Sequence, residues 1–355
     1  MQKVLIGKNQ AGQRLDKFLH KYLPLAGNGF LYKMLRKKNI TLNGKKAEGR
    51  EILALQDQVT FFLSDETIAR FSGNTEVPER ESGGREITVR RNVLLGEYMA
   101  AYDTLQGIRV LYEDEDCLIV NKPAGILTQK ASPGDLSVNE WLTGYLLSRN
   151  PDFAEELPVF RPSVCNRLDR NTSGIVLCGK SLKGLQYLGR CIKEHTLRKY
   201  YRTICVGALE ESGAVEGYLQ KDASQNRVTV SGRPRAQGEE KESPIRTVYT
   251  PLKTARDYTL LEVELITGKS HQIRAHLAGM GHPLIGDFKY GNETVNVRLK
   301  KRYGLEHQLL HAGKVVFPEK TDGPDLAIMG RSISAPVPDL FFTLEKALFP
   351  RGSLL

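Results

Sequence analysis

The sequence predicts an α+β protein in which helices and loops flank a mainly antiparallel, mixed sheet, with a small α/β unit in front of it. Short apolar strands and amphipathic helices follow one another in mixed order, and several breaks between strands are typical of hairpin turns. The 355 residues suffice for one large domain and one small one, each with its own core. We therefore expect two folded units.

The composition is that of a soluble globular protein, with 40% apolar and 26% charged residues. The net charge of +10 favours a polyanionic partner. Five cysteines form an odd set without a close pair, which excludes a disulfide framework and a zinc knuckle and favours a reducing compartment. No apolar run reaches the length of a membrane span, so we expect a cytoplasmic protein without a membrane partner.

The first 63 residues contain a concentrated basic segment. Residues 15–22 and 30–38 have helical spacing, and residues 40–46 form a strand entering an Asn-Gly turn. Residues 30–50 hold seven Lys or Arg against one Glu. Such a run is usually a solvated helix face, but here the strand and turn continue it, which favours contact with phosphates. The candidate RNA-binding residues are Lys33, Arg36, Lys37, Lys38 and Lys45.

Residues 1–63 resemble an S4 RNA-binding domain, whose pattern is RLDxFL, a basic helix and a hydrophobic residue before an Asn-Gly turn. The chain departs from it at Gly29-Phe30, where Ser-Arg is usual, and at Gln56-Asp57, where Gly-Asp is usual. Residues 64–105 are charged and rich in breakers, so we expect a linker that is partly ordered around residues 93–95. The main domain then covers residues 106–350.

Asp169 is the candidate nucleophile of this domain. It lies between two arginines in a polar loop, residues 165–174, that leads into an apolar strand. Loops on a rigid scaffold commonly display reactive groups. The alternative is a surface aspartate in a solvated ion pair. In the strand at residues 199–207, Tyr201, Thr203 and Cys205 alternate onto one face.

Residues 260–277 form a strand, a Thr-Gly turn and a helix for which Ser270 is the expected N-cap. His271 and Arg274 are three apart and share a helical face. The histidines of this region lack HExxH spacing and interleaved acidic ligands, so no metal site is predicted. The sequence contains no GxSxG motif, so a serine hydrolase is not indicated.

Several short motifs, in order along residues 106–345, resemble those of the RluA family of RNA pseudouridine synthases. They are Lys122-Pro123-Ala124-Gly125, Arg167-Leu168-Asp169 with Thr172-Ser173-Gly174, Lys199 with Tyr201 and Gly207, residues 267–276, residues 281–287, and Leu310-His311-Ala312. The resemblance implies the pseudouridine synthase fold. It also implies isomerisation of specific uridines in structured RNA, above all large-subunit (23S) ribosomal RNA, without a cofactor or metal.

The resemblance also implies roles for individual residues. Asp169 would be the catalytic carboxylate, as nucleophile or as base of a glycal route, and Arg274 would hold it ionised. Tyr201 would stack on the flipped base, with core packing as the alternative. We expect Arg167 and Lys269 to contact RNA, and His271 and His311 to be structural. The chain departs from the family in having Asn166 where His is common, and Lys269 where Arg is common.

Three other functions remain open at this point. A non-catalytic RNA-binding or ribosome assembly factor would keep the same fold and basic segment. A pseudouridine synthase directed to transfer RNA would share the motifs, and a metal-dependent nuclease would lose activity to a chelator. We expect a monomer.

Overall fold

The computed structural model describes residues 1–72, 84–222, 227–231, 243–321, 323 and 325–350. Its N-terminal unit has a four-stranded antiparallel sheet in the order β1-β4-β2-β3. Apolar side chains of two helices pack on this sheet and form a core of their own. The elements are β1 (Gln2–Leu5), α1 (Leu15–Tyr22), α2 (Asn28–Arg36), β2 (Ile40–Leu42), β3 (Lys45–Lys46) and β4 (Gln58–Phe61).

The turn between β2 and β3 has the geometry that its sequence predicts. Asn43 and Gly44 both have positive φ, 51° and 73°. A two-residue hairpin turn of the mirror-image type needs positive φ at both positions, and Asn-Gly is the pair that adopts it most readily. The turn therefore fixes the basic end of the hairpin, including Lys45, on the surface.

The segment expected to be a linker, residues 64–105, contains two helices, α3 (Asp65–Ser72) and α4 (Gly84–Thr104). Residues 73–83 lie outside the described residues. The structure differs from the expectation at α4, because Tyr98 and Ala101 are buried in the main hydrophobic core. They pack against α5 (Val138–Arg149), where Gly144 has no Cβ to hold the two helices apart.

The main domain contains an 11-stranded sheet in the order β11-β10-β12-β13-β9-β14-β8-β6-β5, with β15 beside β14 and β7 beside β8. Every pairing is antiparallel except that of β14 with β8, so the predicted α+β class with a mainly antiparallel, mixed sheet is confirmed. The strands are β5 (Arg109–Glu113), β6 (Cys117–Lys122), β7 (Ser163–Val164), β8 (Ser173–Gly179), β9 (Arg198–Val206), β10 (Gly213–Asp222), β11 (Arg227–Ser231), β12 (Ser243–Thr254), β13 (Tyr258–Leu265), β14 (Leu310–Val316) and β15 (Ser332–Ser334).

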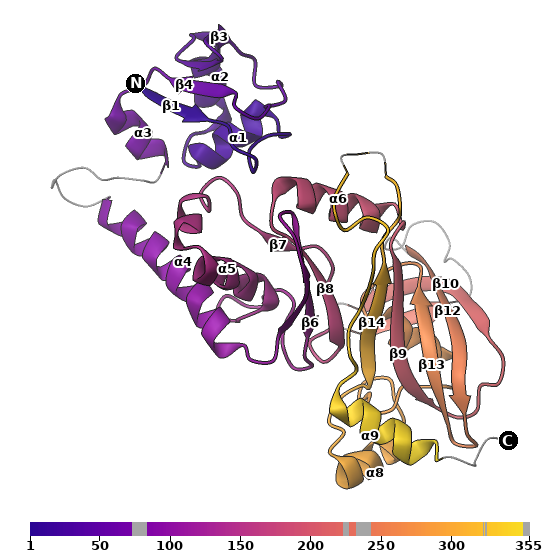
Figure 1. Ribbon diagram of the computed structural model, residues 1–355. Helices are drawn as coiled ribbons and strands as arrows, with labels where there is room; N and C mark the ends of the chain where they lie inside the picture. Colours follow the sequence, from indigo (N-terminus) through magenta and orange to yellow (C-terminus); the bar gives the residue numbers. More distant parts are fainter. Residues whose placement is uncertain (73–83, 223–226, 232–242, 322, 324, 351–355) are drawn as a thin grey trace.

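Helices cover both faces of this sheet (Figure 1). Along β6, Leu118 and Val120 join a core with α5 and α7, whereas Cys117 and Ile119 join another with α6. A further core joins β9 and β13 to α8 and α9. The remaining helical elements are η1 (Pro151–Glu155), α6 (Leu182–Lys193), α7 (Gln272–Gly279), α8 (Glu293–Tyr303) and α9 (Asp339–Leu348).

The parallel pairing of β8 with β14 fixes the start of β8. Gly174 has a φ of +115°, and a Cβ added there would lie 2.3 Å from the carbonyl oxygen of Ala312. Only glycine allows the two backbones to come this close. The loop that carries Asp169 ends at this point, so its end is held against the middle of the sheet.

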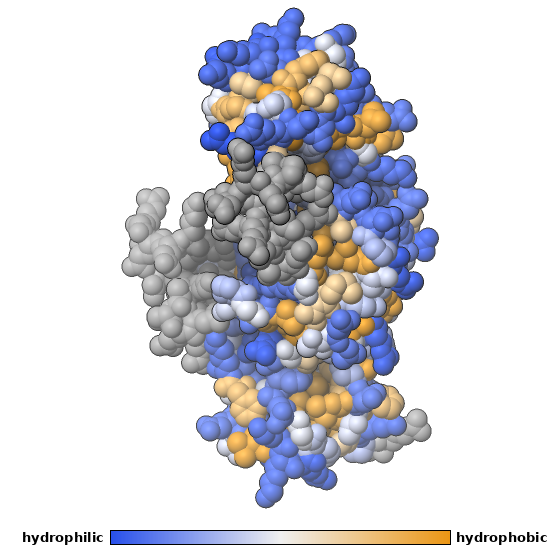
Figure 2. Space-filling view, turned by 90° about the vertical axis from the view of Figure 1, so that its left-hand side faces the viewer, coloured by the Kyte–Doolittle hydropathy of each residue, from blue (hydrophilic) through white to orange (hydrophobic). Residues whose placement is uncertain are grey.

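The surface is mostly polar on the face shown in Figure 2, where hydrophilic side chains surround smaller hydrophobic areas. Among the described residues, no helix combines the length and the apolar character needed to cross a lipid bilayer.

Candidate active site

The loop that carries Asp169 is held by hydrogen bonds on both sides. The Thr128 hydroxyl donates to the carbonyl of Leu168 (2.9 Å) and accepts from its N–H (3.1 Å). Asn166 donates to the carbonyl of Ile175 (3.1 Å) and accepts from the N–H of Leu177 (2.7 Å), both on β8. The residue that departs from the family pattern therefore ties the loop to the sheet.

Lys122 joins this loop to the end of β6. Its side chain is fully buried, and Nζ donates to the carbonyls of Pro123 (3.0 Å), Ile126 (2.9 Å) and Arg170 (3.0 Å). Burial lowers the pKa of Lys122 to about 7, and the negative charge of Asp169 opposes that shift. The ammonium group thus lies within the electrostatic reach of Asp169.

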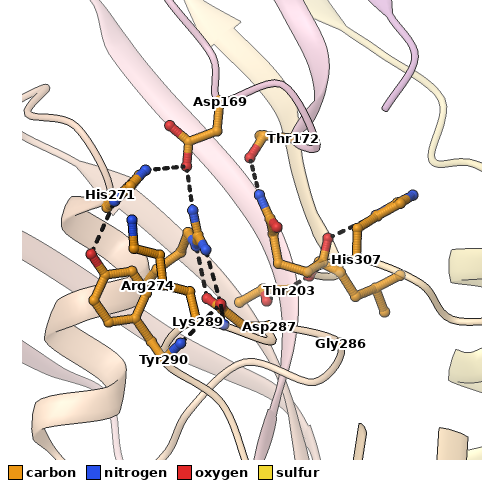
Figure 3. Close-up of polar contacts among 12 residues, drawn as sticks. Asp169, Thr172, Thr203, His271, Arg274, Gly286, Asp287, Lys289, Tyr290 and His307 are labelled. Carbon is orange, nitrogen blue, oxygen red and sulfur yellow. Dashed lines mark hydrogen bonds and ion pairs between the residues drawn. The ribbon is translucent and has the colours of Figure 1, made fainter. Parts of the chain in front are cut away.

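Arg274, on α7, links Asp169 to a second carboxylate. Its Nη1 donates to Oδ2 of Asp169 (2.9 Å), while Nε and Nη2 donate to the two oxygens of Asp287 (2.7 and 2.8 Å), as Figure 3 shows. Burial acts to lower the pKa of Arg274, but hydrogen bonds and charges, first from Asp287 and then from Asp169, raise it overall. Burial raises the pKa of Asp287, whereas Arg274 and the N–H groups of Lys289 and Tyr290 lower it overall.

His271 lies on the other side of Asp169. Its Nε2 is 3.8 Å from Oδ2 of Asp169, and its Nδ1 is 3.0 Å from the hydroxyl of Tyr290. Burial lowers the pKa of His271 despite the opposing charge of Asp169. The imidazole is therefore neutral near pH 7. The sequence assigned His271 a structural role and did not predict its contact with Asp169.

The helix that carries Arg274 begins one residue later than a Ser270 N-cap predicts, at Gln272, and Ser270 is not its N-cap. His271 occupies the N-cap position with a left-handed φ of 57° and makes no capping hydrogen bond. Instead, the Gln272 side chain accepts hydrogen bonds from the N–H of Lys269 (3.1 Å) and the hydroxyl of Thr267 (2.9 Å). These contacts stabilise the turn in place of a serine cap.

Tyr201 is both a core residue and a neighbour of Asp169. Only 7% of it is exposed, and it belongs to the main hydrophobic core. Burial raises its pKa, and the negative charge of Asp169 raises it further. The side chain of Asp169 itself is 24% exposed. Of the three residues predicted as catalytic, Asp169 and Arg274 thus form a direct ion pair at a carboxylate that solvent reaches, and Tyr201 lies within electrostatic range of that carboxylate.

Comparisons with known proteins agree with this architecture. The sequence model of the RNA pseudouridylate synthase family matches residues 116–279, which include Asp169, Tyr201 and Arg274. A Mycoplasma pneumoniae protein described as an uncharacterized RNA pseudouridine synthase is 30% identical over 323 residues, covering 89% of this chain and 88% of that protein. The chain belongs to the RNA pseudouridine synthase family.

Other pseudouridine synthases extend the comparison. The ribosomal large subunit pseudouridine synthase C of Rickettsia bellii is 29% identical, over 92% of this chain and 95% of its own. The structure of human RNA pseudouridylate synthase domain containing 4 shares the fold, with a TM-score of 0.53 at 20% identity over 74% of this chain and 97% of that one. The pseudouridine synthase fold predicted from the motifs is confirmed.

Three residues around Asp169 received no role from the sequence, although two of them, Lys122 and Asp287, stand in the motifs quoted above. The sequence position of Lys122 indicated its contacts, because the ammonium group of a lysine that ends an apolar strand needs buried hydrogen-bond acceptors. Asp287 and Tyr290 stand in a turn between Gly286 and Gly291, a pattern that indicates a tight turn but not its contacts. Within the described parts of the chain, no three His, Cys, Asp or Glu side chains group in a way that could hold a metal ion.

The predicted RNA-contacting residues are on the surface, but in two units. Arg167 and Lys269 are exposed in the main domain, on the Asp169 loop and on the turn before α7. The other five are exposed on the N-terminal unit, at the end of α2 and on the hairpin that follows: Lys33, Arg36, Lys37, Lys38 and Lys45.

Proposed function

We propose that Asp169 is the catalytic carboxylate with which this RNA pseudouridine synthase isomerises specific uridines of large-subunit ribosomal RNA. The observation that carries the proposal is the pairing of a partly exposed carboxylate with a buried guanidinium, at 2.9 Å between Oδ2 of Asp169 and Nη1 of Arg274. The names of relatives such as the Rickettsia bellii enzyme support a ribosomal RNA substrate.

The reaction needs little more than this carboxylate. The bond between ribose C1′ and uracil N1 breaks, the base rotates, C5 bonds to C1′, and the proton on C5 leaves while N1 gains one. Substrate and product are isomers, so the reaction consumes no oxidant and no second substrate. Asp169 either attacks C1′ as a nucleophile or removes the ribose 2′ proton on a glycal route. Arg274 donates a charge-assisted hydrogen bond that orients the carboxylate for either step.

A uridine in folded RNA must leave its stack before Asp169 reaches it, at a cost of a few kcal/mol. We assign Tyr201 to stacking on the extruded base. Its raised pKa keeps the phenol protonated near neutral pH, which suits a stacking group better than a base. The five exposed cations of the N-terminal unit, in an S4-like arrangement, would bind the surrounding phosphates and offset part of the cost.

Asp169→Asn tests the catalytic proposal. The substitution keeps the shape of the side chain but removes its charge, so RNA binding should persist while pseudouridine formation falls below detection. Release of tritium from C5 of uridine measures turnover, and Asp257→Asn, at an exposed position, is the matched control. A fully active Asn variant would contradict the proposal and favour a non-catalytic role.

Mapping pseudouridines in total RNA from a strain that lacks the gene tests the substrate. We expect sites to disappear from large-subunit ribosomal RNA and to return with the wild-type gene but not with Asp169→Asn. Loss confined to transfer RNA would contradict the ribosomal assignment and leave the chemistry intact.

A further inference from the structure

We propose that one turn, residues 287–290, positions both partners of Asp169, with Asp287 acting through Arg274 and Tyr290 acting through His271. This inference rests on the proposed role of Asp169 and adds two positioning residues to it. Asp287 binds Arg274, and Tyr290 lies within hydrogen-bond distance of His271, so each holds a group that approaches the Asp169 carboxylate.

The turn is rigid enough to position other groups. Asp287 is 1% exposed, and its Oδ1 accepts from the N–H groups of Lys289 (3.0 Å) and Tyr290 (3.1 Å). Its carbonyl accepts from the N–H of Gly291 (2.7 Å) and from Nδ2 of Asn296 (2.9 Å), a buried residue of α8. The backbone and the carboxylate of Asp287 are therefore fixed from both the turn and the helix behind it.

Asp287 determines which nitrogen of Arg274 is left to bind Asp169. A guanidinium normally binds a carboxylate with two parallel hydrogen bonds. Here Nε and Nη2 make that bidentate pair with Asp287, so only Nη1 reaches Asp169, and only at Oδ2. Asp287 thus leaves a single nitrogen of Arg274 for the Asp169 carboxylate.

Tyr290 holds the other neighbour. Its hydroxyl lies 3.0 Å from Nδ1 of His271, and its ring lies under the guanidinium of Arg274, at 5.1 Å from Cζ. His271 has the left-handed φ of 57° that non-glycine residues rarely adopt, and such strain persists only where surrounding contacts hold it. A hydroxyl that donates to Nδ1 leaves the proton on Nε2, which faces Asp169.

The test compares Asp287→Asn and Tyr290→Phe with wild type and with Asp257→Asn, a carboxylate-to-amide change at an exposed position. The substrate is total RNA from a strain lacking the gene, labelled with tritium at C5 of uridine. We expect the single-turnover rate to fall roughly 10²-fold for Asp287→Asn. For Tyr290→Phe we expect a fall of roughly tenfold, the loss of one hydrogen bond. The affinity for RNA should stay within twofold, because neither residue binds RNA in this proposal.

The split between rate and affinity separates positioning from a merely structural role. In Asp287→Asn the single-turnover rate should fall while the affinity for RNA stays within twofold, whereas a variant with a damaged fold would lose both.

An unchanged rate overturns the inference, and so does a lower rate that is accompanied by an equal loss of affinity for RNA. If Asp287→Asn fails to fold, the test rests on Tyr290→Phe, which removes one hydroxyl and keeps the ring. An unchanged rate in Tyr290→Phe then overturns the inference. Wild type and Asp169→Asn belong to the same experiment. An inactive wild type, or an active Asp169→Asn variant, would contradict the proposed function. An active wild type together with a wild-type rate in Asp287→Asn would contradict only the positioning role of the turn.

Discussion

Arg274 carries one positive charge between two carboxylates. This arrangement requires an arginine rather than another cationic residue. The link to Asp287 is buried, because the side chains of Arg274 and Asp287 are 8% and 1% exposed, whereas that of Asp169 is 24% exposed. Loss of one partner from a buried ion pair costs about 3–5 kcal/mol. A lysine would keep the charge but could not make the bidentate pair with Asp287 and reach Asp169 at the same time.

His276 gives a residue-scale prediction on stability. It is 1% exposed, its Nδ1 is 2.7 Å from the hydroxyl of Thr247, and its Nε2 is buried with no partner in the described structure. Burial lowers its pKa to about 4 from the usual 6.5, so the folded protein binds fewer protons than the unfolded chain between those values. The stability that His276 contributes is therefore complete above pH 6.5 and is lost as the pH falls towards 4.

We expect this one residue to account for about 3 kcal/mol of acid destabilisation. Urea denaturation at several pH values measures it, and His276→Gln should reduce the slope between pH 6.5 and 4. His271 and His311 have pKa values lowered by burial as well, so part of the slope remains. An unchanged slope in the Gln variant would contradict the prediction.

Elements were predictable where local pattern decides them. The Asn-Gly turn and the amphipathic helices α1 and α2 follow from backbone preference and 3.6-residue periodicity. The α4 helix did not, because its partner α5 begins 34 residues after α4 ends and the apolar pattern of α4 itself is weak. The Asp169 loop was recognisable from its residues. The role of Asp287 depends on its contact with Arg274, which no local sequence pattern encodes.

The contact between α4 and α5 gives an element-scale prediction. A Cβ added to Gly144 would lie 2.2 Å from the carbonyl oxygen of Tyr98 and 2.7 Å from Cβ of Tyr102. Gly144→Ala should therefore push α4 off α5 and lower the free energy of unfolding by about 1–3 kcal/mol. The matched control is Gly96→Ala on α4, where nothing lies within 4 Å of an added Cβ.

Gly96→Ala should raise stability by up to about 1 kcal/mol, because alanine is the better helix former. Thermal and urea unfolding of both variants measure the difference. Equal effects of the two substitutions would indicate that α4 does not dock on α5.

The whole molecule has a hydrophobic core in the N-terminal unit and others in the main domain. The two units meet through Val159, which packs against the N-terminal core, and through polar pairs. Lys8 pairs with Glu115 at 3.4 Å, but both side chains are highly exposed. Asn9 donates a hydrogen bond to Glu156. Exposed ion pairs contribute about 0–1 kcal/mol.

The proposed RNA surface gives a prediction at this scale. Replacing Lys33, Arg36 and Lys37 by alanine should weaken RNA binding and reduce the slope of log affinity against log salt by about 2–3. The rate at saturating RNA should not change, because these residues lie outside the Asp169 site. Filter binding at several salt concentrations measures the slope.

The matched control replaces Lys300, Lys301 and Arg302, three exposed cations at the end of α8. We expect it to keep the wild-type slope. Equal losses from both triple variants would show that overall charge, rather than the N-terminal unit, determines binding.

The link from Asp169 to Arg274 spans 105 positions along the chain, and Asp287 lies 13 further on. During translation, the loop with the carboxylate leaves the ribosome long before its guanidinium partner does. A polypeptide that ends before residue 274 therefore has the loop but lacks the guanidinium that contacts it, and one that ends before residue 287 lacks the carboxylate that holds this guanidinium. We expect the proposed chemistry only from a chain long enough to close this domain on itself.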